Sequence, residues 1–134
     1  MNDNDANAFP KIEIANVVLD CTDIEALSEF YIRMLGWRKD YAEDGQWLSI
    51  CSPSGGVGIG FQNNPSYIPP TWPEEPNSQQ QMLHIDFAVQ GEEELARAVQ
   101  HAISCGAAKA AMQYSDEWVV MIDPAGHPFC FVVR

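Results

Sequence analysis

The stretch NVVLDCTDIEALSEFYIRMLGW, residues 16–37, decides the fold, because it contains a strand, the start of a helix and the end of that helix in succession. Its first part is apolar and rich in β-branched side chains, which is typical of a largely buried strand. Thr22 and Glu25 then have the spacing of a capping box, so a helix is expected to begin here. Apolar side chains recur at helical spacing until Gly36, where the helix is expected to end.

The same order of features recurs over residues 84–109. The alternating strand sequence LHIDFAV is followed by three glutamates at a helix start, and the apolar helical stripe stops at Gly106. After each helix come a strand with a tryptophan, Trp47 or Trp118, then a proline-containing turn and a further strand. The chain is therefore expected to contain two βαβββ copies.

These copies predict an α+β domain in which two βαβββ modules form curved mixed sheets, with the helices outside and a cavity within the curve. A single domain is expected over residues 11–134, after a disordered N-terminus over residues 1–10. Module one would take residues 11–62 and module two residues 82–134. Residues 63–81 between them are rich in proline and poor in strand-forming side chains, so we interpret them as a linker or a lid.

The composition excludes several classes of partner. The 134 residues include 19 acidic and 7 basic side chains, a formal net charge of −12. A protein that binds nucleic acid or an anionic membrane surface needs clustered Lys and Arg, which this sequence lacks. No segment is apolar enough to span a bilayer, and the polar N-terminus lacks the features of a secretion signal. The four cysteines form no CxxC pair, so we expect a reduced protein of the cytoplasm.

Three segments together resemble a known family. NVVLDCTDIEALSEFYIRMLGW, the second strand HIDFAV and the closing DPAGHPFCF are similar to the glyoxalase, bleomycin-resistance and extradiol-dioxygenase superfamily, also called vicinal oxygen chelate proteins. Within it, the chain most resembles the glyoxalase-like domain branch. The resemblance implies paired βαβββ modules, a cavity in each curved sheet and usually a homodimer. For catalytic members it also implies one divalent metal, held by His, Gln or Glu from the first and last strands of both modules.

The metal-ligand positions of this family can be transferred to the sequence one by one. The first-strand positions are Asn16 and His84, and the last-strand position of module two is Cys130. The fourth position falls on Ile59 or Gly60, a one-residue difference in register that the sequence leaves open. Because catalytic metals of this family use imidazole and carboxylate donors, and this set offers one imidazole and no carboxylate, we expect no metal and no cofactor. A module with a cavity and no metal resembles the bleomycin-resistance branch, whose acidic dimers sequester a cationic drug.

His84 and Asp86 are two residues apart in a predicted strand, so both face its cavity side. His84 is either a pocket residue for hydrogen bonding or proton transfer, or a core histidine bonded to a backbone carbonyl. Asp86 would orient His84 or stay ionised as a charge that binds a ligand. Cys130 is either a pocket-wall residue or a nucleophile with His84 as its base.

Aromatic residues and a third histidine complete the candidate pocket. Trp72 lies beside Glu74 and Glu75, where it would either hold a cation or pin the linker to the body. His127 would either shape the DPAGH turn or contact a ligand at the pocket mouth. Phe61 belongs to a strand whose glycines leave one face bare, so it is predicted to line the pocket. The full set of ligand-binding candidates is Asn16, Trp47, Phe61, Trp72, His84, Trp118, His127 and Cys130.

Three functional hypotheses follow. The first is a homodimeric protein that binds a small aromatic or cationic molecule without a catalytic metal. The second is a lyase or isomerase of the glyoxalase type, with a degenerate metal site or with His84 and Asp86 as its catalytic residues. The third is a domain whose curved sheets serve only for dimerisation.

Overall fold

The computed structural model describes residues 9–134, so most of the segment predicted to be disordered, residues 1–10, lies outside the described residues. Module one consists of β1 (Asn16–Cys21), α2 (Ile24–Leu35), β2 (Arg38–Glu43), β3 (Trp47–Cys51) and β4 (Gly58–Asn63). Module two consists of β5 (Ile85–Val89), α3 (Gly91–Cys105), β6 (Ala108–Lys109), β7 (Trp118–Ile122) and β8 (Pro128–Val133). Neither helix combines the length and the hydropathy that crossing a membrane requires.

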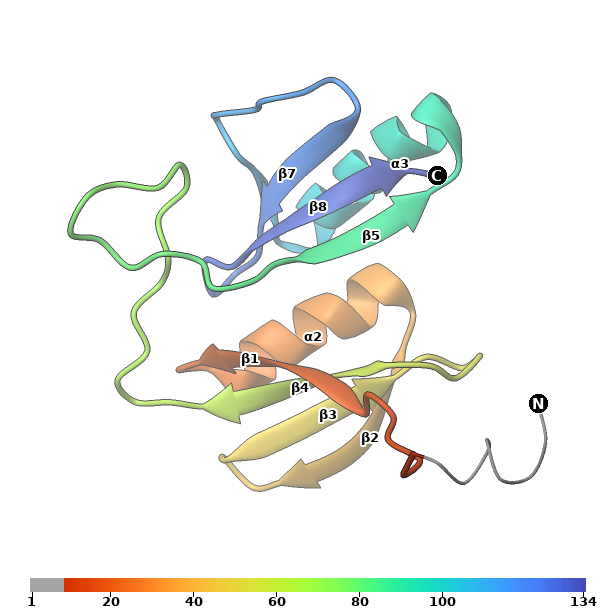
Figure 1. The fold of residues 1–134 in the computed structure, drawn as a ribbon, viewed down its shortest axis with the longest axis vertical. Helices are drawn as coiled ribbons and strands as arrows, with labels where there is room; N and C mark the ends of the chain where they lie inside the picture. Colours follow the sequence, from red (N-terminus) through yellow and green to blue (C-terminus); the bar gives the residue numbers. More distant parts are fainter. Residues whose placement is uncertain (1–8) are drawn as a thin grey trace.

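Both modules form a four-stranded sheet of the same topology (Figure 1). The strand orders are β1-β4-β3-β2 and β5-β8-β7-β6. In each sheet the first strand runs parallel to the last, and the other neighbours are antiparallel. The predicted α+β fold of two βαβββ modules is therefore confirmed, and the two sheets stay separate instead of closing into one barrel.

One apolar core joins the two modules. Helix α2 packs on β3 and β4, helix α3 packs on β5, β6 and β8, and the helices also contact each other. The rings of Phe30 and Tyr31 in α2 each lie 6.1 Å from the ring of Phe129 in β8. Aromatic side chains bury large apolar areas, so this cluster contributes strongly to holding the modules together. The helices cover one face of each sheet, and the opposite face remains open for a site.

Hydrogen bonds also cross the boundary between the modules. The Tyr31 hydroxyl donates to Oδ2 of Asp123 at 2.8 Å, and this bond is buried. The Nε2 atom of His127 lies 2.7 Å from the backbone oxygen of Asp20 in β1. From the connecting segment, the Tyr67 hydroxyl donates to the backbone oxygen of Ala125 at 2.8 Å. The DPAGH turn of module two is thus bonded to a helix, a strand and the segment between the modules.

Some element boundaries differ from those that the sequence predicts. Helix α2 is capped by Asp23 instead of Thr22, because the Asp23 carboxylate accepts the backbone N–H of Ala26 at 3.0 Å. Ile14 and Leu83 precede their strands and are 72% and 58% exposed. Leu83 therefore does not pack against the helix side of β5. The alternating run LHIDFAV predicts that Leu83 belongs to the strand, but a strand begins only where it gains a hydrogen-bonded neighbour.

Candidate functional site

The open face of module two is formed by alternate residues of three neighbouring strands. Asp86 of β5 and Val120 of β7 both pair with Cys130 of β8, and Trp118 pairs with Val132. Side chains of paired residues project to the same side of a sheet. The odd-numbered neighbours, such as Phe87 and Phe129, project to the other side and pack against each other in the core.

A cavity of about 330 Å³ lies over this face. Its volume is within the range of small-molecule sites in proteins, which is roughly 300–1,000 Å³. Polar groups come from His84, Asp86 and Gln81, and the two tryptophans and the two valines provide apolar wall. The cavity is lined by Trp72, Gln81, His84, Asp86, Trp118, Val120, Pro128, Cys130 and Val132.

His84, Asp86 and Cys130 form a polar cluster in this cavity. The Nε2 atom of His84 lies 3.2 Å from Oδ1 of Asp86, and the two side chains are 43% and 51% exposed. The possible donor atoms of the three side chains all lie within 4.8 Å of one another. Asp86 therefore reaches both neighbours, and His84 is a pocket residue instead of a core histidine bonded to a backbone carbonyl.

The cluster does not activate Cys130 as a nucleophile. Burial, and then the nearby negative charge of Asp86, raise the pKa of the Cys130 thiol to about 11. At neutral pH the sulfur is consequently protonated, whereas nucleophilic attack requires the thiolate. Cys130 fits the alternative role of a pocket-wall residue, since it lines the cavity and only 7% of its surface is exposed.

Two tryptophans from distant parts of the chain meet at the cavity. The Trp72 indole N–H donates to the backbone oxygen of Met112 at 2.9 Å, and the ring meets Tyr114 edge to face at 5.6 Å. Trp118 of β7 lines the same cavity and is 37% exposed. Trp72 thus pins the connecting segment and also lines the cavity. The acidic group that shares the cavity with it is Asp86, because Glu74 and Glu75 lie outside the lining.

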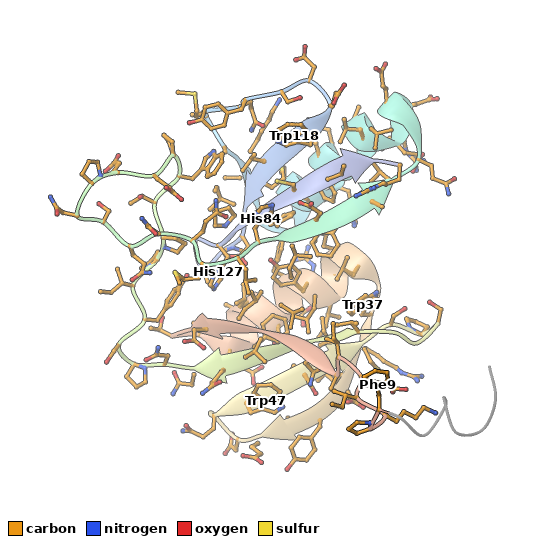
Figure 2. The ribbon with its side chains drawn as sticks, viewed as in Figure 1. Phe9, Trp37, Trp47, His84, Trp118 and His127 are labelled. Atoms are coloured by element: carbon orange, nitrogen blue, oxygen red, sulfur yellow. The ribbon has the colours of Figure 1, made fainter. Side chains whose placement is uncertain are left out.

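The open face of module one is built differently. Ile59 is buried in the core, and Gly60 faces the open side, where a Cβ atom would overlap the ring of Trp47. The Trp47 ring therefore occupies the space in front of Gly60. Asn16 is exposed at the start of β1. Neither Trp47 nor Asn16 lines the module two cavity, and Figure 2 shows Trp47 on the module one sheet, well apart from His84 and Trp118.

Two candidates from the sequence require correction. Phe61 is fully buried and stacks on Tyr31 at 5.7 Å between ring centroids, so it belongs to the core and does not line a pocket. His127 does not reach the module two cavity. It lies beside Tyr67 and lines a second cavity, of about 370 Å³, at the junction of the modules. Its backbone N–H donates to Asp123 at 2.9 Å, so the turn-shaping role fits it.

The two βαβββ modules and the open faced sheets define this protein as a member of the vicinal oxygen chelate superfamily. More specifically, the family model described as "Glyoxalase-like domain" matches residues 16–132, so the chain belongs to that family. No curated protein sequence matches the chain.

Solved structures share this fold at low sequence identity. A glyoxalase/bleomycin resistance protein/dioxygenase family enzyme from Burkholderia phytofirmans has a TM-score of 0.69 at 17% identity, covering 91% of this chain and 98% of its own. A possible glyoxalase from Bacillus cereus has a TM-score of 0.68 at 14% identity, with 91% and 99% coverage. Lactoylglutathione lyase from Agrobacterium tumefaciens has a TM-score of 0.64 at 16% identity, with 93% and 96% coverage.

The donor set does not fit the two-module metal site that the superfamily implies. The position that the sequence left open is Gly60, which has no side chain and is covered by Trp47. Module one therefore contributes at most the amide of Asn16, a weak ligand. In module two, the donor atoms of His84, Asp86 and Cys130 lie within 4.8 Å of one another, so every strong donor would come from one module.

Sequence reasoning missed four residues of the cavity wall. Three of them could have been found from the sequence. Pro128 and Val132 alternate with Cys130 along one strand, and Val120 pairs with Cys130 across the hairpin that the DPAGH turn predicts. Gln81 gives no such signal. It lies in the irregular segment before β5, where neither period nor register places a side chain.

Proposed function

We propose that this protein binds a small aromatic or cationic molecule in the module two cavity, without the catalytic metal of its superfamily. The observation that carries the proposal is the meeting of Trp72, Trp118 and Asp86 in one cavity. Indole faces attract both flat apolar groups and cations, and a carboxylate beside them adds charge attraction for an ammonium group.

Electrostatics on a larger scale support a cationic ligand. The net charge of −12 attracts cations toward the protein and repels anions. Within the cavity, Asp86 is half exposed and its only ionic partner among the described residues is His84, which is charged only when protonated. The carboxylate therefore remains available for a ligand cation. The related structures contribute only the fold to this argument, since their identities are 14–17%.

The test titrates the protein with three matched probes and measures binding by tryptophan fluorescence and by calorimetry. Benzylamine carries a ring and a charge, benzyl alcohol only the ring, and cyclohexylmethylamine only the charge. We expect benzylamine to bind with the highest affinity. Asp86→Asn should weaken it by about tenfold or more, because a hydrogen bond to a charged group is worth ~1.5–3 kcal/mol. Trp118→Leu should weaken benzylamine and benzyl alcohol alike.

The matched control is Glu92→Gln, which removes one acidic charge in the first turn of α3, away from the cavity lining. It should leave the benzylamine affinity unchanged. If Glu92→Gln weakens benzylamine binding as much as Asp86→Asn does, the effect of Asp86→Asn reflects only the net charge of the protein. If none of the three probes saturates the protein, the proposal that this cavity binds a ligand is wrong. The hypothesis of a domain whose sheets serve only for dimerisation then gains support.

Metal analysis tests the remaining part of the proposal. The protein would be purified without chelator, and its metal content measured together with thermal shifts on adding Ni²⁺, Zn²⁺, Mn²⁺ or Fe²⁺. We expect no stoichiometric metal and the same small shifts in wild type and His84→Ala. One bound metal per chain that is lost in His84→Ala would overturn the metal-free assignment.

A lyase or isomerase is the second candidate, and the 3.2 Å contact between His84 and Asp86 favours it. In this function the pair would transfer a proton to or from a ligand carbon, with Asp86 holding the imidazole in place. Exchange of a ligand C–H with solvent deuterium, lost in His84→Ala with ligand binding retained, would identify such activity.

We also propose a homodimer of the cytoplasm. Exposed apolar side chains occur before β1 and before β5, including Ile12, Ile14, Met82 and Leu83. Exposed apolar patches often mark subunit contacts. The four free cysteines fit a reducing compartment. Light scattering coupled to gel filtration measures the mass of the protein in solution, and a mass of 14.9 kDa, that of one chain, would exclude the dimer.

A further inference from the structure

Two cavities lie back to back in this protein, and Gln81 lines both of them. One is the module two cavity that contains Trp118 and Asp86. The other, of about 370 Å³, lies between β1 and the segment that connects the modules. Their lining residues are neighbours in the chain: Leu83 and His127 belong to the second cavity, and His84 and Pro128 to the first. The two linings therefore adjoin, and Gln81 is the side chain that they share.

Gln81 has an unused hydrogen-bonding group at this boundary. Its Oε1 atom is buried and has no hydrogen-bond partner among the described residues. A buried acceptor without a partner costs ~1–3 kcal/mol, so such groups are rare unless something else supplies the donor. The side chain as a whole is only half-buried and lines both cavities.

The second cavity offers both apolar and polar surface. Ile68, Met82 and Leu83 line it and are 64%, 85% and 58% exposed. Gln79 and Gln80 line it as well, and so does Asp20, whose carboxylate already accepts a hydrogen bond from Asn64 at 3.1 Å. A ligand that reaches through both would place a cation at one end and a second apolar group at the other.

We propose that Gln81 joins the two cavities into one elongated site, and that it selects ligands with an N–H or O–H donor between a cationic aromatic end and a second apolar end. This inference rests on the proposed function, because the cationic end occupies the module two cavity. Gln81 is a specificity-determining residue in this arrangement, and its amide oxygen accepts the hydrogen bond from the ligand.

The experiment uses three probes of increasing length and one matched pair of variants. Benzylamine fills the module two cavity alone. 4-(Aminomethyl)benzanilide adds an amide N–H and a second ring, and phenyl 4-(aminomethyl)benzoate has the same shape with an ester oxygen in place of the N–H. We expect the amide to bind at least about tenfold more tightly than benzylamine, and about five- to tenfold more tightly than the ester, from one net hydrogen bond.

Gln81→Met removes the acceptor at similar size and should abolish the preference for amide over ester, which is a ratio of two affinities in the same variant and so cancels any change in binding of the shared benzylamine part. Gln80→Met, which alters a residue of the second cavity only, should keep that preference. If benzylamine binds but the amide binds no better, or if the preference survives in Gln81→Met, the inference is wrong while the proposed function stands. If benzylamine itself does not bind the wild type, the proposed function fails first.

Discussion

At the scale of single residues, Cys130 shows how neighbours decide the chemistry of a side chain. Its thiol lies beside Asp86, and burial together with that charge raises its pKa to about 11. We predict that iodoacetamide labels Cys130 very slowly at pH 7 to 8 and faster as the pH approaches 11. Asp86→Asn should shift this profile to lower pH, because a neutral amide does not disfavour the thiolate.

Mass spectrometry of the Cys130 peptide measures this labelling. In the same samples, the half-buried Cys51 lies outside the cavity, so its labelling should not respond to Asp86→Asn. A Cys130 profile that is identical in both proteins would show that Asp86 does not act on the thiol.

Gly60 is the second residue whose role depends on a close neighbour. A Cβ atom here would overlap the Trp47 ring, so the ring must move in Gly60→Ala. We predict a displaced and more exposed Trp47, with a stability change limited to about 1 kcal/mol, because the ring is the free end of a side chain and alanine favours a strand over glycine. Fluorine NMR of protein labelled with 5-fluorotryptophan should show one shifted signal, assigned to Trp47 with Trp47→Phe.

The signals of Trp72 and Trp118 provide the internal control for this change. They belong to the module two cavity and should keep their positions in Gly60→Ala. If all four tryptophan signals move, the substitution alters the fold as a whole and the local interpretation is wrong.

At the scale of elements, helix α2 depends on its two ends. Asp23 caps the N-terminus through a 3.0 Å bond to the Ala26 N–H, and Gly36 ends the helix in the left-handed conformation at φ 69°. We predict that Asp23→Ala lowers the free energy of unfolding by about 1 kcal/mol, through loss of this bond and of a charge at the positive end of the helix dipole. Thr22→Ala should change it by less than about 0.5 kcal/mol.

Chemical denaturation of the three proteins gives these free energies. Equal losses for Asp23→Ala and Thr22→Ala would support the capping box at Thr22 that the sequence suggested. The helix ends at Gly36 and Gly106 were correctly predicted, because both residues terminate a stripe of apolar side chains. The choice between Thr22 and Asp23 could not be made from the pattern, since adjacent residues can both cap a helix and the backbone dihedrals decide which one does.

At the scale of the whole molecule, a buried carboxyl group that links the two modules makes stability depend on pH. The Tyr31 hydroxyl of α2 donates to Asp123, whose pKa is raised because its carboxyl group is buried. A raised pKa means that the folded protein binds this proton more tightly than the unfolded chain does. The contribution of Asp123 to stability is thus complete below the unfolded pKa of 3.8 and is lost as the pH rises through the folded value.

We predict that the free energy of unfolding of the wild type, relative to that of Asp123→Asn, falls as the pH rises from below 3.8. The reason is that asparagine keeps hydrogen-bonding groups but does not ionise. Denaturation at a series of pH values measures the difference. Asp116→Asn, at an exposed position, is the matched control and should show no such trend. An advantage of the wild type that grows with pH would contradict the assigned direction.

The sequence by itself determined the repeat of two βαβββ modules, the two helices with their C-terminal ends, and the placement of Asp86 and Cys130 on neighbouring strands, with His84 just before the first of these strands. These features follow from side-chain periodicity and turn chemistry, which act over a few residues. Tertiary structure alone decided that Trp72 and Trp118 share a cavity with that cluster, that Phe61 lies in the core, that Trp47 covers Gly60 and that Gln81 lines two cavities. Each of these contacts joins side chains to segments whose relative position is set by packing, and no local pattern encodes that position.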